Sequence, residues 1–177
     1  MNDRIHRRTK YLTVSAMLSA LGVVILSLGA LVDVLDITTA VVASFLIIYA
    51  VIEMGGAYPW LIWLVTSCLS LLLLPQKTPA LFYALFAGFY PILKEKLERL
   101  RDLIAYPLKL LVFHLSLGGI VVTVRLFFPS LLESGAAWWM PLLLYFAALL
   151  CFLIYDLALT RLISYYLIKL QRRFHIK

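Results

Sequence analysis

Two ionisable side chains, His114 and Asp156, lie within apolar stretches of this 177-residue chain and are its first candidates for chemistry. An ionisable group inside a bilayer is costly and often marks a functional position. His114 can act in a relay or as a ligand, and together with Asp156 it could serve an intramembrane enzyme. The simpler interpretations are a hydrogen bond from His114 to a neighbouring helix and an ion pair for Asp156, and the sequence leaves both open.

The patterns of common intramembrane enzymes are absent from the sequence. It has no His-Glu-x-x-His zinc motif, no Gly-x-Ser-Gly with a later histidine, and no Walker A loop for nucleotide phosphates. Cys68 and Cys151 both fall within apolar stretches, where a disulfide or zinc site is not expected. We therefore predict that the chain is not an enzyme and has no catalytic residue, metal site or cofactor.

Apolar stretches dominate the chain, which is 64% hydrophobic. A bilayer core of about 30 Å requires roughly 17–25 apolar residues per helix, and every backbone amide inside it must be paired internally. We predict an all-α membrane protein, a six-transmembrane-helix bundle forming a single integral membrane domain over residues 1–177. The predicted spans cover about residues 11–32, 37–54, 57–75, 79–93, 107–128 and 138–160.

The basic residues predict the orientation of these spans. Fourteen of the sixteen lysines and arginines fall in the N-terminal tail, in the segment between the fourth and fifth spans, or in the C-terminal tail. Only Lys77 and Arg125 fall on the opposite side. The positive-inside rule then places both termini in the cytoplasm, and the chain in the cell (inner or plasma) membrane. Anionic lipid explains the net charge of +7 better than nucleic acid does.

Two further segments are predicted to lie at the cytoplasmic surface. Residues 94–106 show helical spacing of apolar residues among charges and predict an amphipathic interfacial helix. Residues 161–177 are predicted to form a cytoplasmic tail.

Local signals predict how the spans begin and end. Asp36 precedes Ile37-Thr38-Thr39, so its carboxylate is expected to cap the second span. Trp60 and Trp63 are expected in an aromatic belt at the inner interface. Pro91 is expected to distort the last turn of the fourth span.

The first span is rich in small residues, among them Ser15, Ala16, Ser19 and Ala20. Helices in lipid associate where small residues let their backbones approach. This strip can pack within the protein's own bundle, or it can dock a second membrane subunit near the inner surface. The sequence leaves both interpretations open.

A second group of residues lies toward the outer half of the predicted bundle. Small-molecule pockets combine aromatic walls with a few polar groups, so this group is the predicted substrate-binding set, with belt anchoring as the alternative for its two tryptophans. Its members are Asp33, Lys77, Tyr83, Arg125, Trp138, Trp139 and Tyr145.

The segment Ala16-Met-Leu-Ser-Ala20 resembles the Ala-x-x-x-Ala motif in the first helix of the substrate-binding S components of energy-coupling factor (ECF) transporters. Those proteins are similar in size, with six helices and both termini inside. The resemblance implies docking through helix one to a coupling transmembrane subunit that is driven by two ATPase subunits. It also implies a ligand pocket that opens outward. No signature for riboflavin, thiamine, biotin or folate is present.

The function expected from this resemblance is uptake of a vitamin-like small molecule, with ATP hydrolysis supplied by the partner complex. The alternative is a non-transporting membrane scaffold subunit of a cell-envelope assembly, which would need the docking strip but no ligand pocket.

Overall fold

The computed structural model describes residues 2–98, 100, 102–127 and 139–171. These residues form helices and no strand, which confirms the predicted all-α class. The elements are α1 (Asn2–Leu31), the 3-10 turn η1 (Asp33–Leu35), α2 (Asp36–Glu53), α3 (Tyr58–Leu73), α4 (Thr78–Phe82), the π-helical turn η2 (Tyr83–Ala87), α5 (Tyr90–Leu97), α6 (Asp102–Phe127) and α7 (Met140–Gln171).

Four helices among the described residues are long and apolar enough to cross a membrane. The qualifying stretches are Arg8–Leu31, Asp36–Glu53, Ile104–Leu126 and Met140–Tyr166. They match the first, second, fifth and sixth predicted spans and are compatible with a membrane protein. The third predicted span is a shorter apolar helix of 16 residues, and the fourth is divided among α4, η2 and α5.

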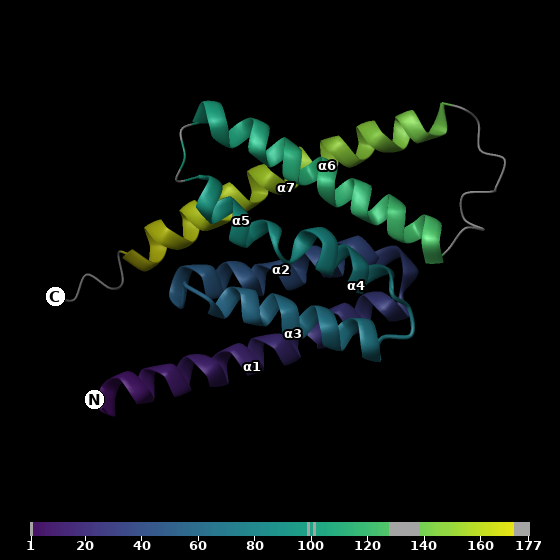
Figure 1. Ribbon diagram of the computed structural model, residues 1–177. Coiled ribbons are helices and arrows are strands. Elements are labelled where there is room, and N and C mark those ends of the chain that lie inside the picture. The colour runs from purple at the N-terminus through teal and green to yellow at the C-terminus, as the bar shows by residue number, and fades with distance from the viewer. Residues whose placement is uncertain (1, 99, 101, 128–138, 172–177) are drawn as a thin grey trace. The chain divides into compact units, whose positions relative to one another are not determined.

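The chain forms two compact units, Met1–Val122 and Thr123–Lys177. In the first unit α2 is central, because it contacts α1, α3, α4, η2 and α5. Figure 1 shows α1, α2 and α3 lying side by side. The core face of α2 carries Ala40, Ala43, Ile47 and Ala50, all buried. Their mostly small side chains allow several helices to approach the α2 backbone.

Two glycines bring α1 close to its neighbours. A methyl group added at Gly22 would lie 2.9 Å from Thr66 Cγ2 of α3, closer than real Cβ contacts allow. One added at Gly29 would collide with the Thr39 hydroxyl of α2. Because Gly22 and Gly29 have no side chain, α1 can pack this closely against α3 and α2.

The connections on either side of α2 are short turns. Leu35, not Asp36, is the N-cap of α2, and no side chain caps the helix there. The prediction of a cap at Asp36 was wrong by one residue; its carboxylate instead lies in the first turn, where the helix dipole favours an acid. At the other end Gly55 and Gly56 have φ of 61° and 62°, a backbone conformation that glycine adopts without steric cost.

The fourth predicted span is interrupted in its middle. The Gly88 amide donates to the Tyr83 carbonyl at 2.8 Å, the i→i+5 bond of a π turn. Pro91 then lies in the first turn of α5, where its missing N–H costs nothing. Pro91 therefore starts a new helix, and the prediction that it distorts the end of an existing one was wrong.

A tryptophan of α3 supports this interruption. Trp63 Nε1 donates to the Ala84 carbonyl at 3.2 Å, and its ring lies edge-on to Phe89 with centroids 6.2 Å apart. Backbone carbonyls in an interrupted helix need other donors when water is excluded. Trp63 is thus a half-buried partner of η2 in addition to its predicted place in an aromatic belt.

The predicted interfacial helix over residues 94–106 is not one helix. Its first residues complete α5, which ends at Leu97, and its last residues belong to α6, which begins at Asp102. Lys94 and Leu97 are buried, with 0% and 7% exposure. The helical spacing of apolar residues over 94–106 therefore belongs to the end of α5 and the beginning of α6, and not to one helix on the membrane surface.

The second unit contains the end of α6 and all of α7. With 32 residues, α7 is about 48 Å long, which exceeds the bilayer core of about 30 Å. It therefore continues beyond the predicted end of the sixth span at residue 160 as helix to Gln171. The rest of the predicted tail lies outside the described residues.

Candidate functional site

The four small residues predicted to dock a partner lie on two faces of α1. Ser15 and Ser19 are buried, with 6% and 4% exposure, whereas Ala16 and Ala20 are exposed. Residues four apart share one side of a helix. The strip therefore divides into an inner serine pair and an outer alanine pair, and we call Ala16 and Ala20 the alanine face.

The serine pair is satisfied inside the protein. Ser15 Oγ donates to the Tyr11 carbonyl at 2.8 Å, and Ser19 Oγ donates to the Ser15 carbonyl at 2.9 Å. Ser15 Oγ also lies 3.9 Å from Met54 Sδ, at the end of α2. Hydroxyls bonded to their own helix let α1 pack closely without leaving a buried polar group unpaired. The serine pair thus serves the protein's own packing.

The alanine face lies on the outside of α1. Large exposed side chains surround it, with Leu12 at 55%, Met17 at 67% and Val24 at 56% exposure. Small side chains between large ones let a second helix approach the α1 backbone closely.

Three members of the predicted substrate-binding set lie in the first unit. Asp33 begins the short turn η1. Lys77 is the N-cap of α4, and its ammonium donates to the Leu74 carbonyl at the end of α3. Tyr83 is 1% exposed and belongs to the same core cluster as Leu74 and Ala80. Lys77 and Tyr83 therefore contribute to the turn after α3 and to the core.

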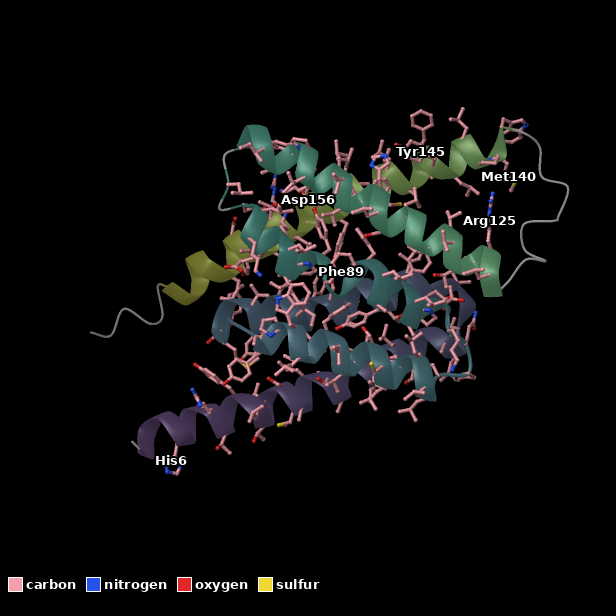
Figure 2. All side chains as sticks on the ribbon, in the orientation of Figure 1. His6, Phe89, Arg125, Met140, Tyr145 and Asp156 are labelled. Carbon is pink, nitrogen blue, oxygen red and sulfur yellow. The ribbon has the colours of Figure 1, made fainter. Side chains whose placement is uncertain are left out.

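The remaining members lie in the second unit or outside the described residues. Arg125 is exposed in the last turn of α6, and Trp139, 50% exposed, immediately precedes α7. Tyr145 is half-buried on α7, with its ring edge-on to Phe146 at 5.8 Å (Figure 2). Trp138 lies outside the described residues.

The ionisable residues of the spans do not form a metal centre in the described part of the chain, where no group of three or more His, Cys, Asp or Glu residues could hold a metal ion. His114 Nδ1 lies 2.7 Å from the Leu110 carbonyl of its own helix. Asp156 is half-buried on α7 (Figure 2). Cys68 and Cys151 are free and exposed.

A charged cluster at the junction of α5 and α6 was not predicted. Glu98 Oε1 lies 3.0 Å from Lys94 Nζ and 3.5 Å from Lys109 Nζ. Lys94 is fully buried and Lys109 is 9% exposed. The spacing of Lys94 and Glu98, four residues apart, was the available signal; the contact with Lys109 depends on the bend between the helices.

An open apolar groove of about 420 Å³ lies between α3, the η2–α5 segment and α6, within the first unit. We call it the aromatic groove. Ser116 is its one hydroxyl-bearing residue, and that hydroxyl already donates to the Val112 carbonyl at 2.8 Å. None of the predicted substrate-binding residues that the structure describes lines it. Its walls are Trp60, Trp63, Ala84, Leu85, Phe89, Leu93, Val112, Leu115, Ser116 and Gly119.

The first unit thus presents an alanine face, a charged cluster and an aromatic groove. The groove lining is apolar except for Ser116, whose hydroxyl is bonded to the Val112 carbonyl, so the chemistry that this lining offers is apolar contact. The alanine face likewise offers close packing and no reactive group. Neither a family model, nor a curated protein, nor a solved structure matches this chain.

Proposed function

We propose that this chain is a multi-pass subunit of the cell membrane that docks to a coupling membrane subunit through the alanine face of α1. In this proposal the chain crosses the membrane six times with both termini in the cytoplasm, and α3 and the α4–η2–α5 segment supply the third and fourth crossings. It acts as the substrate-binding S component of an ECF-type transporter. It captures a vitamin-like molecule from outside, and two ATPase subunits of the partner complex supply the energy.

The exposure of Ala16 and Ala20 carries the proposal. Both side chains lie on the outside of α1. Small residues of a membrane helix are often buried against the other helices of the same protein, and these two are not. The inward positions one residue earlier are filled by Ser15 and Ser19. The alanine pair is therefore available to a partner without unpacking α1 from α2 and α3.

The candidate ligand-binding residues of the proposal are those that the sequence predicted toward the outer ends of the spans. Asp33 and Lys77 belong to the first unit, and Arg125, Trp139 and Tyr145 belong to the second. Tyr83 is left out because its side chain is enclosed in the core. The aromatic groove is also left out, since its lining offers no free polar group to orient a polar metabolite.

Co-purification with an ECF module tests the docking. The tagged chain is co-expressed with a coupling subunit and the two ATPases from the same organism, and retention of all four subunits is measured in mild detergent. Ala16→Trp and Ala20→Trp should each reduce retention at least tenfold, because a lost close contact costs about 1.4 kcal/mol or more. Leu28→Trp is the matched control: it adds the same ring to an exposed site of α1 about two helical turns beyond Ala20.

Equal retention of the Ala16→Trp, Ala20→Trp and Leu28→Trp variants would count against docking through this face. Size-exclusion profiles and helical circular dichroism that match those of the unsubstituted protein show that each variant is folded.

The scaffold alternative shares the docking face and differs in the ligand. The apolar lining of the aromatic groove favours it, because that cavity has no group to recognise a polar metabolite. Native mass spectrometry of the purified chain separates the two. A retained small molecule of defined mass supports the S component, whereas a ligand-free protein that still binds its partner through the alanine face supports the scaffold.

A further inference from the structure

We propose that the aromatic groove binds an anionic phospholipid, with an acyl chain between α3, α5 and α6 and the phosphate at Lys96. This site is separate from the transporter proposal and requires only that the chain is embedded in a membrane.

The lining of the groove favours a hydrocarbon occupant. Trp60, Trp63 and Phe89 form an aromatic wall, and Leu115 with Gly119 forms the facing wall on α6. The Ser116 hydroxyl donates a hydrogen bond within α6, so it does not require a polar group on the molecule that occupies the groove. Apolar surfaces of this kind inside a membrane are covered by lipid chains or by other helices.

The groove follows α6 from Val112 to Gly119, for about 10 Å. An extended acyl chain can lie along this length of the helix.

A cation marks one end of the groove. Lys96 Nζ lies 5.6 Å from the ring centroid of Trp60, which lines the groove, and Lys96 is exposed. Lys94 and Lys109 lie near the same junction, and both contact the single carboxylate of Glu98. Within residues 94–109 of the sequence, three lysines and two arginines accompany three acids, so the basic residues are in excess by two. A phosphate held over Trp60 by Lys96 would place its acyl chain at the mouth of the groove.

Quenching by brominated lipids tests this site, because two of the chain's four tryptophans line it. In the Trp138→Phe, Trp139→Phe background, only Trp60 and Trp63 report. The protein is reconstituted with increasing mole fractions of dibromo-phosphatidylglycerol or dibromo-phosphatidylcholine. The anionic lipid should compete about fivefold more strongly for the reporters, as expected for one cation near an anionic headgroup. Lys96→Gln should remove that preference, and Lys10→Gln, in the N-terminal helix, should retain it.

Two adjacent glycines of α6 allow a matched pair of substitutions that test whether an acyl chain occupies the groove. A side chain at Gly119 enters the groove, whereas a Cβ at Gly118 meets nothing within 4 Å. Gly119→Leu should therefore lower quenching by both lipids severalfold, and Gly118→Leu should leave it unchanged, although both change the same helix. If Gly119→Leu does not fold, Val112→Phe fills the same groove from the same helix.

Three results would overturn the proposal. Equal quenching by the two lipids in the unsubstituted protein would indicate general lipid contact. Unchanged quenching in a folded groove-filling variant would place the lipid elsewhere. Absence of quenching by either lipid would mean that a second copy of the chain or a helix of another subunit covers the groove.

Discussion

Lys94 Nζ and Glu98 Oε1 lie 3.0 Å apart, and the lysine of this pair is fully buried while the glutamate remains one-third exposed. Glu98 also reaches Lys109 at 3.5 Å, so one carboxylate joins the end of α5 to the beginning of α6. A lysine without exposure depends on such a contact, because removing an ammonium group from water is costly.

Glu98→Gln should therefore lower the free energy of unfolding by about 2 kcal/mol, between the values typical of exposed and of buried pairs. Thermal or denaturant unfolding in detergent measures the change. The double variant Lys94→Met, Glu98→Gln should recover most of the loss, because it also removes the buried charge. Glu53→Gln, at an exposed glutamate that ends α2, should change stability by less than about 0.5 kcal/mol. Unfolding of Glu98→Gln identical to that of the unsubstituted protein would contradict the role of this pair.

At Thr66 we expect a substitution to raise the free energy of unfolding. The Thr66 side chain is fully buried against Gly22 of α1, and its hydroxyl has no hydrogen-bond partner among the residues that the structure describes. Valine has nearly the same shape and no hydroxyl, so Thr66→Val should raise the free energy of unfolding by about 1 kcal/mol. Thr39→Val is the matched control, because the Thr39 hydroxyl donates to the Leu35 carbonyl at 3.0 Å. Thr39→Val should not stabilise; if both variants change stability equally, the unpaired hydroxyl is not the cause.

The interruption of the fourth predicted span can be tested at Trp63. Trp63→Phe keeps an aromatic ring but removes the indole donor to the Ala84 carbonyl. The unfolding free energy should fall by about 1 kcal/mol, typical of a hydrogen bond in a membrane protein. Trp60→Phe should lower the unfolding free energy by less. The Trp60 ring makes a cation–π contact with the exposed Lys96, whose ammonium lies 5.6 Å from the ring centroid, and such exposed contacts are weak. Equal losses in the two variants would assign the effect to ring size.

Hydrophobic length predicted the long helices well, because apolar stretches such as those in α2 and α7 must pair their backbone groups internally. It could not predict the π turn at Tyr83–Ala87, since an added residue in a helix leaves no mark on composition. For the same reason Pro91 was placed in the wrong structural context. Its effect depends on whether a helix is ending or starting there, which the turn before it decides.

The candidate site was predictable only in part. The sequence identified the small residues of α1 but could not show that Ala16 and Ala20 are exposed while Ser15 and Ser19 are buried. Lipid and the protein interior are similarly apolar, so the residue types do not indicate which side of the helix faces which. The aromatic groove was not predicted. It is formed by segments as distant in sequence as Trp60 and Gly119, and only the bend at the end of α5 brings these together.

The turn between α3 and α4 decides how many times the chain crosses the membrane. If only the four long helices cross, α3 to α5 stay on the side where α2 ends, and Gln76 lies on the cytoplasmic side. If α3 and the α4–η2–α5 segment also cross, Gln76 lies outside. Both arrangements put the two termini on the same side, so the location of the termini does not distinguish them.

Labelling with a membrane-impermeant maleimide separates the two arrangements. In a background without Cys68 and Cys151, Gln76→Cys should react in intact cells, because the proposed six crossings place this turn outside. Lys96→Cys and His6→Cys should react only after permeabilisation in either arrangement, since the positive-inside rule keeps their basic surroundings in the cytoplasm. Reaction of Gln76→Cys only after permeabilisation would reduce the crossings to four. It would also move Lys77 to the cytoplasmic side, away from the proposed outer ligand site.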